Sequence, residues 1–354
     1  MKEFYKGKRV LVTGHTGFKG AWLCQILLDF GAQLAGYSLK PNTEPNLFTI
    51  LKLDQKVKHK IADIRDFETL DKFIKTFKPE IIFHLAAQPI VRASYDDPKY
   101  TYEANVLGTL NVLESIRLNK VPAGVIITTD KVYKNLEKDI AYKEDDALCG
   151  WDPYSNSKSC ADLVVYSYQQ SFFNPEKYGQ EHKTLISSAR SGNVIGGGDW
   201  AQDRLIPDVM RAFLVDHKTL EIRSPRAVRP WQHVFEPLSG YLLLGQRLHQ
   251  GEIDKAGAWN FGPFDADMQE VESVVKLLID DLGVGKYQIK EDHTKHEANL
   301  LKLSNKKAST QLHWQPRFSL KEAIRETARW YKTYYAGKDV LKLSKEQIKR
   351  FFND

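Results

Sequence analysis

Residues 10–20 read Val-Leu-Val-Thr-Gly-His-Thr-Gly-Phe-Lys-Gly, and this stretch decides the fold. Its first three residues form an apolar run that is too short for a helix and suits a buried strand. Gly14, Gly17 and Gly20 follow at a fixed spacing, and a helical pattern continues up to Gly31, a candidate C-cap. A strand, a glycine turn and a helix in this order are typical of a dinucleotide site, although an ordinary glycine-rich turn shows the same pattern.

Each glycine has an expected task in such a site. Gly14 allows the tight turn, Gly17 lets the backbone approach a pyrophosphate, and Gly20 lets the helix pack closely on the strand. The free N–H groups at the start of the helix then face the anion. We expect Thr16 and Phe18, which lie in the same loop, to contact the cofactor as well.

Composition excludes several classes of protein. The chain has 354 residues, 42% of them hydrophobic, which is enough for one or two domains with a sizeable core. The net charge of +6 is spread along the chain, so we expect no nucleic-acid partner. Three cysteines without a CxxC pair argue against a disulfide framework or a metal site. The charged N-terminus and the lack of an apolar run of about 18 residues predict no signal peptide, no membrane partner and a cytoplasmic location.

Strands alternate with helices through the first half of the chain. This pattern predicts an α/β fold, a Rossmann-type doubly wound parallel sheet with helices on both faces. The expected strands are residues 9–13, 33–38, 57–62, 81–85, 125–129 and 184–190. The expected helices are residues 21–30, 67–77, 100–118 and 155–172. Ligands bind beyond the carboxyl ends of the strands in such a fold.

The ends of the second, third and fourth strands supply further candidates for cofactor binding. The second strand often ends in an acid that bonds the ribose 2′-OH, but this region has none. Lys40 suits a 2′-phosphate instead, so the choice between NAD and NADP stays open. Asp63 and Ile64 end the third strand, where a carboxylate either accepts from the adenine amino group or only begins a turn. The fourth strand ends in residues that either admit the cofactor backbone or pack tightly: Leu85, Ala86, Ala87 and Gln88.

A tyrosine and a lysine one helical turn apart follow the fifth strand. Tyr154 and Lys158 point the same way on a helix, and an ammonium beside a phenol lowers the pKa of that phenol from about 10. Tyr154 is therefore a candidate base for a substrate hydroxyl, and Thr129 can share the proton. A lone YxxxK usually decorates a helix surface, but here it follows a glycine motif and a threonine at a strand end.

These motifs resemble the extended short-chain dehydrogenase/reductase family over almost the whole chain. The resemblance rests on the three glycines, the Ala-Ala strand end, the YxxxK pair and a C-terminal Trp314-x-Pro316. Nucleotide-sugar 4,6-dehydratases of this family place an acid pair, usually Asp-Glu, after the threonine, whereas this chain has Asp130-Lys131. The Asp-Lys form, with HLAAQPIVRASY at 84–95 and RPWQHV at 229–234, is similar to the branch that acts on CDP-glucose.

The resemblance implies a 4,6-dehydration in deoxysugar biosynthesis of the lipopolysaccharide O-antigen type. A hydride passes from sugar C4 to a bound NAD and returns to C6, while water leaves from C5 and C6. Asp130 is then the acid for the departing hydroxyl, and Lys131 stands where the C5 base is usually a Glu. Whether Lys131 is that base, or only orients water or a carboxylate, stays open. The implied cofactor contacts also include Thr128, Tyr154 and Lys158.

The alternation of strands and helices breaks down after residue 190. We expect residues 1–190 to form the NAD-binding domain and residues 191–354 mainly a smaller, mostly helical substrate domain. The segment 227–262 rejoins the first domain, and its last strand lies near Trp259. We expect His233 in this segment to be a core or supporting histidine.

Arginine suits the diphosphate of a nucleotide sugar, because it makes bidentate contacts to phosphate. Arg204, Arg223 and Arg229 are candidates, although any one of them alone is more often a solvated surface residue. The resemblance gives most support to Arg229 and Asn193 as substrate contacts, and it adds Ser94 from the 84–95 motif.

Two further readings of the chain remain. An epimerase for nucleotide sugars would share the glycines and the YxxxK pair but needs no acid after Thr129, and a non-catalytic dinucleotide sensor would tend to lose the Tyr or the Lys. The resemblance also implies a homodimer or homotetramer, in which helices 100–118 and 155–172 pack against their copies.

Overall fold

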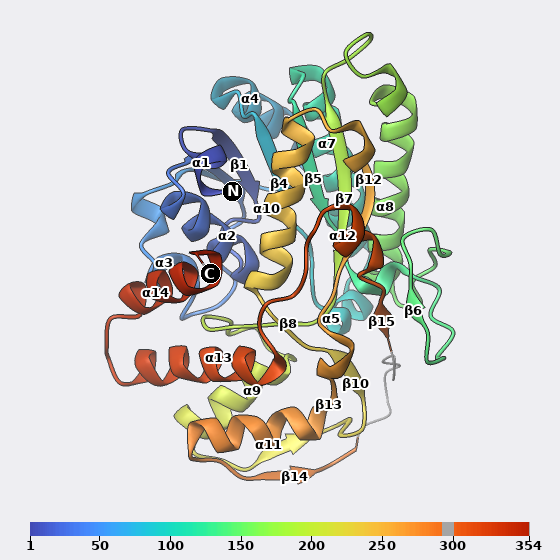
Figure 1. Cartoon of the computed structure of the whole chain (residues 1–354). Coiled ribbons are helices and arrows are strands. Elements are labelled where there is room, and N and C mark those ends of the chain that lie inside the picture. Colours follow the sequence, from blue (N-terminus) through green and yellow to red (C-terminus); the bar gives the residue numbers. More distant parts are fainter. Residues whose placement is uncertain (292–300, 354) are drawn as a thin grey trace.

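A seven-stranded parallel sheet forms the centre of the computed structural model, which describes residues 1–291 and 301–353 (Figure 1). The strand order is β12-β7-β5-β4-β1-β2-β3, and it reverses between β1 and β4, where sheets of this kind bind ligands. The strands are β1 (Arg9–Thr13), β2 (Gln33–Ser38), β3 (Lys58–Ile61), β4 (Ile81–His84), β5 (Ala123–Ile127), β7 (Leu185–Ser191) and β12 (Gly257–Phe261).

The strand predictions are confirmed. β1 and β2 have the predicted bounds, and the ends of the other four predicted strands shift by one or two residues. Trp259 lies in β12, which rejoins the main sheet as expected and pairs there with β7. Neighbouring residues of β1 face opposite sides of the sheet, so Val10 and Val12 belong to one buried core and Leu11 to a second.

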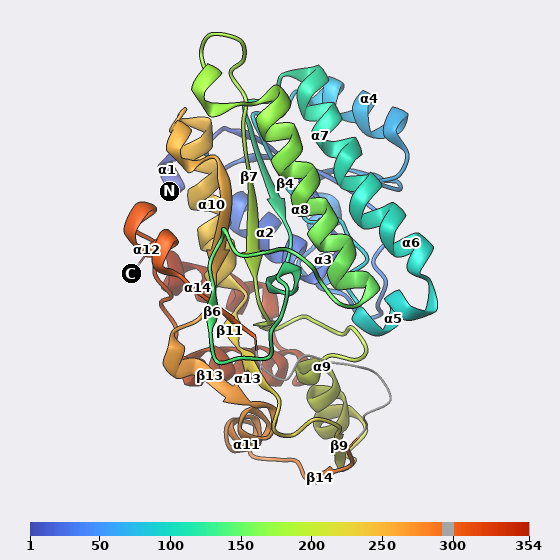
Figure 2. The same ribbon diagram turned by 90° about the vertical axis from the view of Figure 1, so that its right-hand side faces the viewer.

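Helices cover both faces of the sheet (Figure 2). α2 (Phe18–Asp29) and α10 (Phe235–His249) pack on one face, and α4 (Phe67–Phe77), α7 (Gly108–Asn119) and α8 (Pro153–Phe172) on the other. The predicted helix 100–118 is interrupted, because α6 (Pro98–Tyr102) and α7 are joined by a π-helical turn over Glu103–Leu107. In that turn the Asn105 amide accepts from the backbone of Gln88 and donates to Ser157.

A second layer lies beyond the carboxyl ends of the strands, below the sheet in Figure 1. It contains α9 (Leu205–Met210), α11 (Val271–Leu282), α13 (Leu320–Tyr335) and two-stranded sheets formed by β8 (Val194–Ile195), β9 (Leu220–Ile222), β10 (Val228–Pro230), β11 (Gln232–His233), β13 (Met268–Glu270) and β14 (Tyr287–Ile289). The remaining α-helices and strands are α1 (Lys2–Tyr5), α3 (Leu47–Ile50), α5 (Val91–Asp96), α12 (Lys306–Gln311), α14 (Val340–Asn353), β6 (Ala141–Tyr142) and β15 (Lys302–Leu303). No helix in the described ranges combines the length and apolarity that a membrane span needs.

Candidate active site

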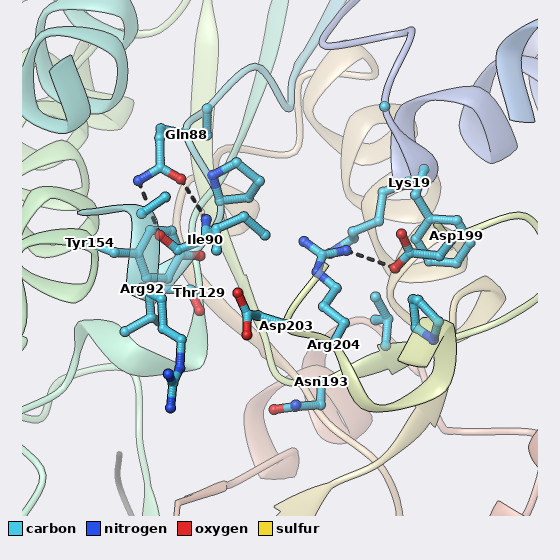
Figure 3. A pocket seen from close by; sticks show the side chains of 18 of the residues that line it. Lys19, Gln88, Ile90, Arg92, Thr129, Tyr154, Asn193, Asp199, Asp203 and Arg204 are labelled. Atoms are coloured by element: carbon cyan, nitrogen blue, oxygen red, sulfur yellow. Dashed lines mark hydrogen bonds and ion pairs between the residues drawn. The ribbon is translucent and has the colours of Figure 1, made fainter. Parts of the chain in front are cut away.

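A cavity of about 720 Å³ opens at the carboxyl ends of the strands, between the sheet and the second layer. Every predicted site residue except Ser94 lines this cavity. Figure 3 shows part of it, with Thr129 and Tyr154 on one side and Lys19, Asp199 and Arg204 on the other. Within the ranges that the structure describes, no three His, Cys, Asp or Glu side chains gather as a metal site.

The glycine loop is built for close backbone approach. Gly14 has φ +72°, and a Cβ there would lie 2.7 Å from the backbone nitrogen of Ala86. A Cβ on Gly20 would lie 2.1 Å from the Gly14 carbonyl oxygen, so the first turn of α2 packs directly on the turn after β1. Gly17 is the N-cap of α2 and offers no side-chain cap, which leaves the first N–H groups of the helix able to bind a pyrophosphate.

The ends of β2 and β3 line the same end of the cavity. The Thr16 hydroxyl donates to the Leu39 carbonyl over 2.9 Å and fixes the glycine loop on the end of β2. The Asp63 carboxylate accepts from the backbone and guanidinium of Arg65 at 2.9–3.1 Å. An adenine contact of Asp63 stays a prediction, and it would compete with this ion pair.

The turn after β4 is braced by Gln88. Its side-chain oxygen accepts from the Ile90 N–H over 2.6 Å (Figure 3). Its side-chain nitrogen donates to the Thr101 hydroxyl over 2.9 Å. The Gln88 side chain is therefore engaged within the turn, and its backbone N–H and carbonyl are both bonded to the Asn105 side chain. A cofactor contact of Gln88 stays a prediction.

Tyr154 and Lys158 lie in the first two turns of α8, which starts at Pro153 behind the N-cap Asp152. Both side chains are largely removed from solvent and line the cavity. The Lys158 ammonium donates to the Ile127 carbonyl over 2.8 Å, at the end of β5. Burial lowers the pKa of Lys158 to about 8, while the Asp162 carboxylate opposes that change.

The expectation that Lys158 lowers the pKa of Tyr154 towards neutrality is wrong for this structure. Burial raises the pKa of Tyr154 to about 12, and a hydrogen bond from Thr129 offsets only part of this rise. The cause is desolvation of the phenolate, since the Lys158 ammonium is directed to a carbonyl oxygen.

Asp130 follows the end of β5 and begins a short 3₁₀ turn (Asp130–Val132) that is capped by Thr129. Its carboxyl is buried and accepts from the Thr129 hydroxyl over 3.0 Å. Burial raises the pKa of Asp130, although the Lys131 and Arg229 charges pull it down. A raised pKa favours the protonated form, which is the form that an acid catalyst needs. Lys131 is partly buried and lines the cavity.

Comparisons with known proteins fit this geometry. Residues 11–327 match the model of the family described as GDP-mannose 4,6 dehydratase. The chain belongs to this family. It is 46% identical over 354 residues to CDP-glucose 4,6-dehydratase of Salmonella typhimurium, covering 99% of this chain and 98% of the relative. A probable dTDP-glucose 4,6-dehydratase of Sinorhizobium fredii is 25% identical over 91% of this chain and 92% of its own.

Solved structures share the fold of this family member. DesIV, a dTDP-glucose 4,6-dehydratase from Streptomyces venezuelae with NAD and TYD bound, superposes with a TM-score of 0.78 at 24% identity, covering 94% of this chain and 99% of its own. UDP-glucose 4-epimerase of Thermus thermophilus in complex with NAD also gives 0.78, at 23% identity and 92% and 99% coverage.

Ser94 is a correction to the predicted substrate contacts of this dehydratase-family chain. It is fully buried and does not line the cavity. Its hydroxyl donates to the Val91 carbonyl over 2.6 Å and accepts from the Tyr154 N–H over 3.1 Å. Ser94 therefore positions the start of α8, because its oxygen satisfies an N–H at the open end of that helix.

Two of the three predicted substrate-side arginines donate to acids. Arg204 donates to Asp199 over 2.9 Å, and Arg223 donates to Asp203 over 3.0 Å. His233 is buried beside aromatic rings, as expected for a core histidine, and burial lowers its pKa to about 3.

Lys19 is a site residue that sequence reasoning missed. Its ammonium donates to the Ser191 hydroxyl over 3.0 Å and to the Tyr241 hydroxyl over 2.9 Å, and it lines the cavity. Burial, together with the Arg204 and Lys158 charges, lowers the pKa of Lys19 to about 7. The available signal was a lysine between the second and third glycines of the motif, at the start of an otherwise apolar helix.

Proposed function

We propose that this protein is an NAD-dependent dehydratase that converts CDP-glucose into CDP-4-dehydro-6-deoxyglucose and water. The observation that carries the proposal is the buried Asp130 and its neighbour Lys131, which share one cavity with Thr129 and Tyr154. An epimerase needs only the last two of these residues. The 46% identity to a CDP-glucose 4,6-dehydratase over almost the whole chain supports the choice of substrate.

The residues present fit a bound NAD. The cavity passes Gly14 and Gly17, where a Cβ-free backbone and the uncapped start of α2 can receive the pyrophosphate. NAD bound there would supply the chemistry of hydride transfer from sugar C4 to C6. At the end of β2, Ser38 and Lys40 line the cavity in place of an acid. NADP is therefore the alternative cofactor, and activity with NAD and with NADP should be compared.

The chain's own residues then move protons at three sugar positions. Tyr154 accepts the proton of the C4 hydroxyl, with Thr129 as hydrogen-bond partner and Arg204 as a charge that favours the phenolate. Asp130 protonates the departing C6 hydroxyl, for which its raised pKa is suited. Lys131 removes the C5 proton or orients the group that does so. Arg229 and Asn193, which line the same cavity, bind the substrate together with Arg204.

Conversion of CDP-glucose tests this proposal directly. Purified protein with NAD should produce a 4-keto sugar that absorbs in alkali. UDP-glucose, dTDP-glucose and GDP-mannose should react far more slowly under the same conditions. A keto sugar formed only from one of those three substrates would contradict the assigned substrate. Conversion of CDP-glucose to CDP-galactose without a keto sugar would show that the protein is an epimerase.

We also propose a division of labour and a dimer. Residues 1–190 bind the cofactor, and residues 191–354 mainly bind the substrate, although β12 and α10 return to the sheet. α7, α8 and the π-helical turn before α7 carry exposed apolar side chains suited to a second copy of the chain: Leu107, Leu118, Leu163, Tyr166 and Phe172. A cytoplasmic location is consistent with three unpaired cysteines.

A further inference from the structure

The two parts of the fold that line the cavity indicate where the base of a nucleotide sugar lies. Gly14 and Asp63 line the end of the cavity at the strands of the sheet, and Tyr154 lines it at the start of α8. Asp208 of α9 and residues of β9 line the end that belongs to the second layer (Figure 2). If the cofactor fills the first end and the sugar C4 lies at Tyr154, the diphosphate and base of the substrate extend towards α9 and β9.

Several carboxylates line this far end, and most are already engaged. Asp199 accepts from Arg204, and Asp203 accepts from Arg223. Glu221 of β9 accepts from Lys290 over 3.1 Å and is exposed. Each of these oxygens therefore has a cation partner that a ligand would have to displace.

Asp208 differs from these acids. Among residues 1–291 and 301–353, the only cation within ion-pair distance of its carboxylate is Arg211, at 3.6 Å, which is beyond a normal hydrogen bond. About a third of the side chain is exposed, and it lines the cavity. Asp208 thus brings to the substrate end of the cavity a carboxylate with acceptor capacity to spare.

We propose that Asp208 selects the cytosine base of the substrate, its carboxylate accepting a hydrogen bond from the 4-amino group. The proposal rests on the proposed CDP-glucose activity and gives that activity its base specificity. Cytosine presents an amino donor at C4, and aspartate is a matching acceptor for it. Uracil and thymine present a carbonyl oxygen at the same position, so two acceptors would face each other with no proton between them.

Binding of CDP and UDP to single variants tests this assignment. Calorimetric titration at pH 8 with either nucleotide should show a preference of the wild-type protein for CDP. Asp208→Asn places an amide donor opposite O4 of uracil, so the CDP-over-UDP ratio should fall at least about tenfold. Glu221→Gln removes one negative charge from the same end of the cavity and should keep the wild-type ratio. An unchanged ratio in Asp208→Asn, or an equal fall in Glu221→Gln, would overturn the proposal.

A measurement on the unmodified protein guards against a variant that does not fold. Burial raises the pKa of Asp208 to about 6, with Asp203 and Asp199 adding to the rise and Arg211 and Arg223 opposing it. A protonated carboxyl can donate to O4 of uracil, so the CDP-over-UDP ratio should fall as pH is lowered from 8 to 5.5. A ratio that is constant over this range would contradict the role of Asp208.

The proposed substrate and the proposed role of Asp208 fail separately. A wild-type protein that forms the keto sugar from UDP-glucose and not from CDP-glucose would refute the proposed substrate. A wild-type protein that prefers CDP-glucose, with the same kcat/KM ratio for CDP-glucose over UDP-glucose in Asp208→Asn, would refute only the role of Asp208.

Discussion

At the scale of single residues, the site divides its work between a strand end and a helix start. Thr129, Asp130 and Lys131 follow β5, whereas Tyr154 and Lys158 begin α8. The buried Asp130 carboxyl has a raised pKa and suits proton donation, so oxidation at C4 and elimination at C5 and C6 should be separable by mutation.

Substitution at Tyr154 and at Asp130 should stop the reaction at different steps. Tyr154→Phe loses the oxygen that accepts the C4 proton, so no reduced nicotinamide should form on rapid mixing with CDP-glucose. Asp130→Asn cannot protonate the leaving hydroxyl, so absorbance at about 340 nm, the dihydronicotinamide band, should rise and persist. Overall turnover should fall by about 10²–10⁴-fold in Asp130→Asn. Absence of reduced cofactor in Asp130→Asn would move that residue to the oxidation step or to folding.

Lys131→Met separates the two roles left open for that lysine. If Lys131 serves the elimination step, the variant should accumulate reduced cofactor as Asp130→Asn does. Normal turnover of Lys131→Met would show that the C5 base lies elsewhere.

His15 gives a pH effect on stability with a defined sign. It is fully buried against Phe48 and His59, and burial lowers its pKa to about 3. The unfolded chain protonates this histidine below about pH 6.5, whereas the folded protein keeps it neutral, so its contribution to stability falls as pH decreases. In urea unfolding, the free energy of unfolding of His15→Leu minus that of wild type should increase by about 1.4 kcal/mol for each pH unit below about pH 6.5. If the difference in free energy of unfolding between His15→Leu and wild type were the same at pH 7.5 and pH 5.5, this would contradict a neutral, buried His15.

At the scale of elements, the closest packing in the glycine motif is that of α2 against the turn after β1. Gly20→Ala would place a Cβ 2.1 Å from the Gly14 carbonyl oxygen and should destabilise the protein by about 1–3 kcal/mol or more. Gly17→Ala is the matched control, since its Cβ would lie 3.4 Å from the same oxygen. Thermal melting of both variants should show a clear loss only for Gly20→Ala, and equal melting temperatures would contradict this packing.

Local patterns in the sequence predicted the strands of the central sheet and most of the helices that cover it, whereas some residue roles depend on contacts between distant residues. β1 follows from an apolar run before a glycine, and α4 from a helical pattern behind Asp66, whose side chain caps it. The partners of Lys19, in contrast, lie 172 and 222 residues away in the chain, and Ser94 meets Tyr154 across 60 residues. Periodicity and spacing carry no information about such pairs, so these two roles emerged only from the fold.

At the scale of the whole molecule, the apolar face of α7 and α8 predicts self-association. Sedimentation at micromolar concentration should show a dimer or larger species in place of the 40.6 kDa monomer. Leu163→Asp with Tyr166→Asp should shift the protein towards monomer, because both side chains are exposed on α8. Val215→Asp, at an exposed apolar residue of the second layer, is the control and should keep the assembly. A wild-type protein that sediments only as a monomer would reject the dimer.

The central claim is that one cavity carries out both halves of an internal redox reaction. CDP-glucose labelled with deuterium at C4 tests it most directly, with the product followed by NMR and the nicotinamide by absorbance. We expect a 4-keto-6-deoxy product with deuterium at C6 and no net release of reduced cofactor. Loss of deuterium from the product, or release of one reduced cofactor for each sugar, would contradict the claim.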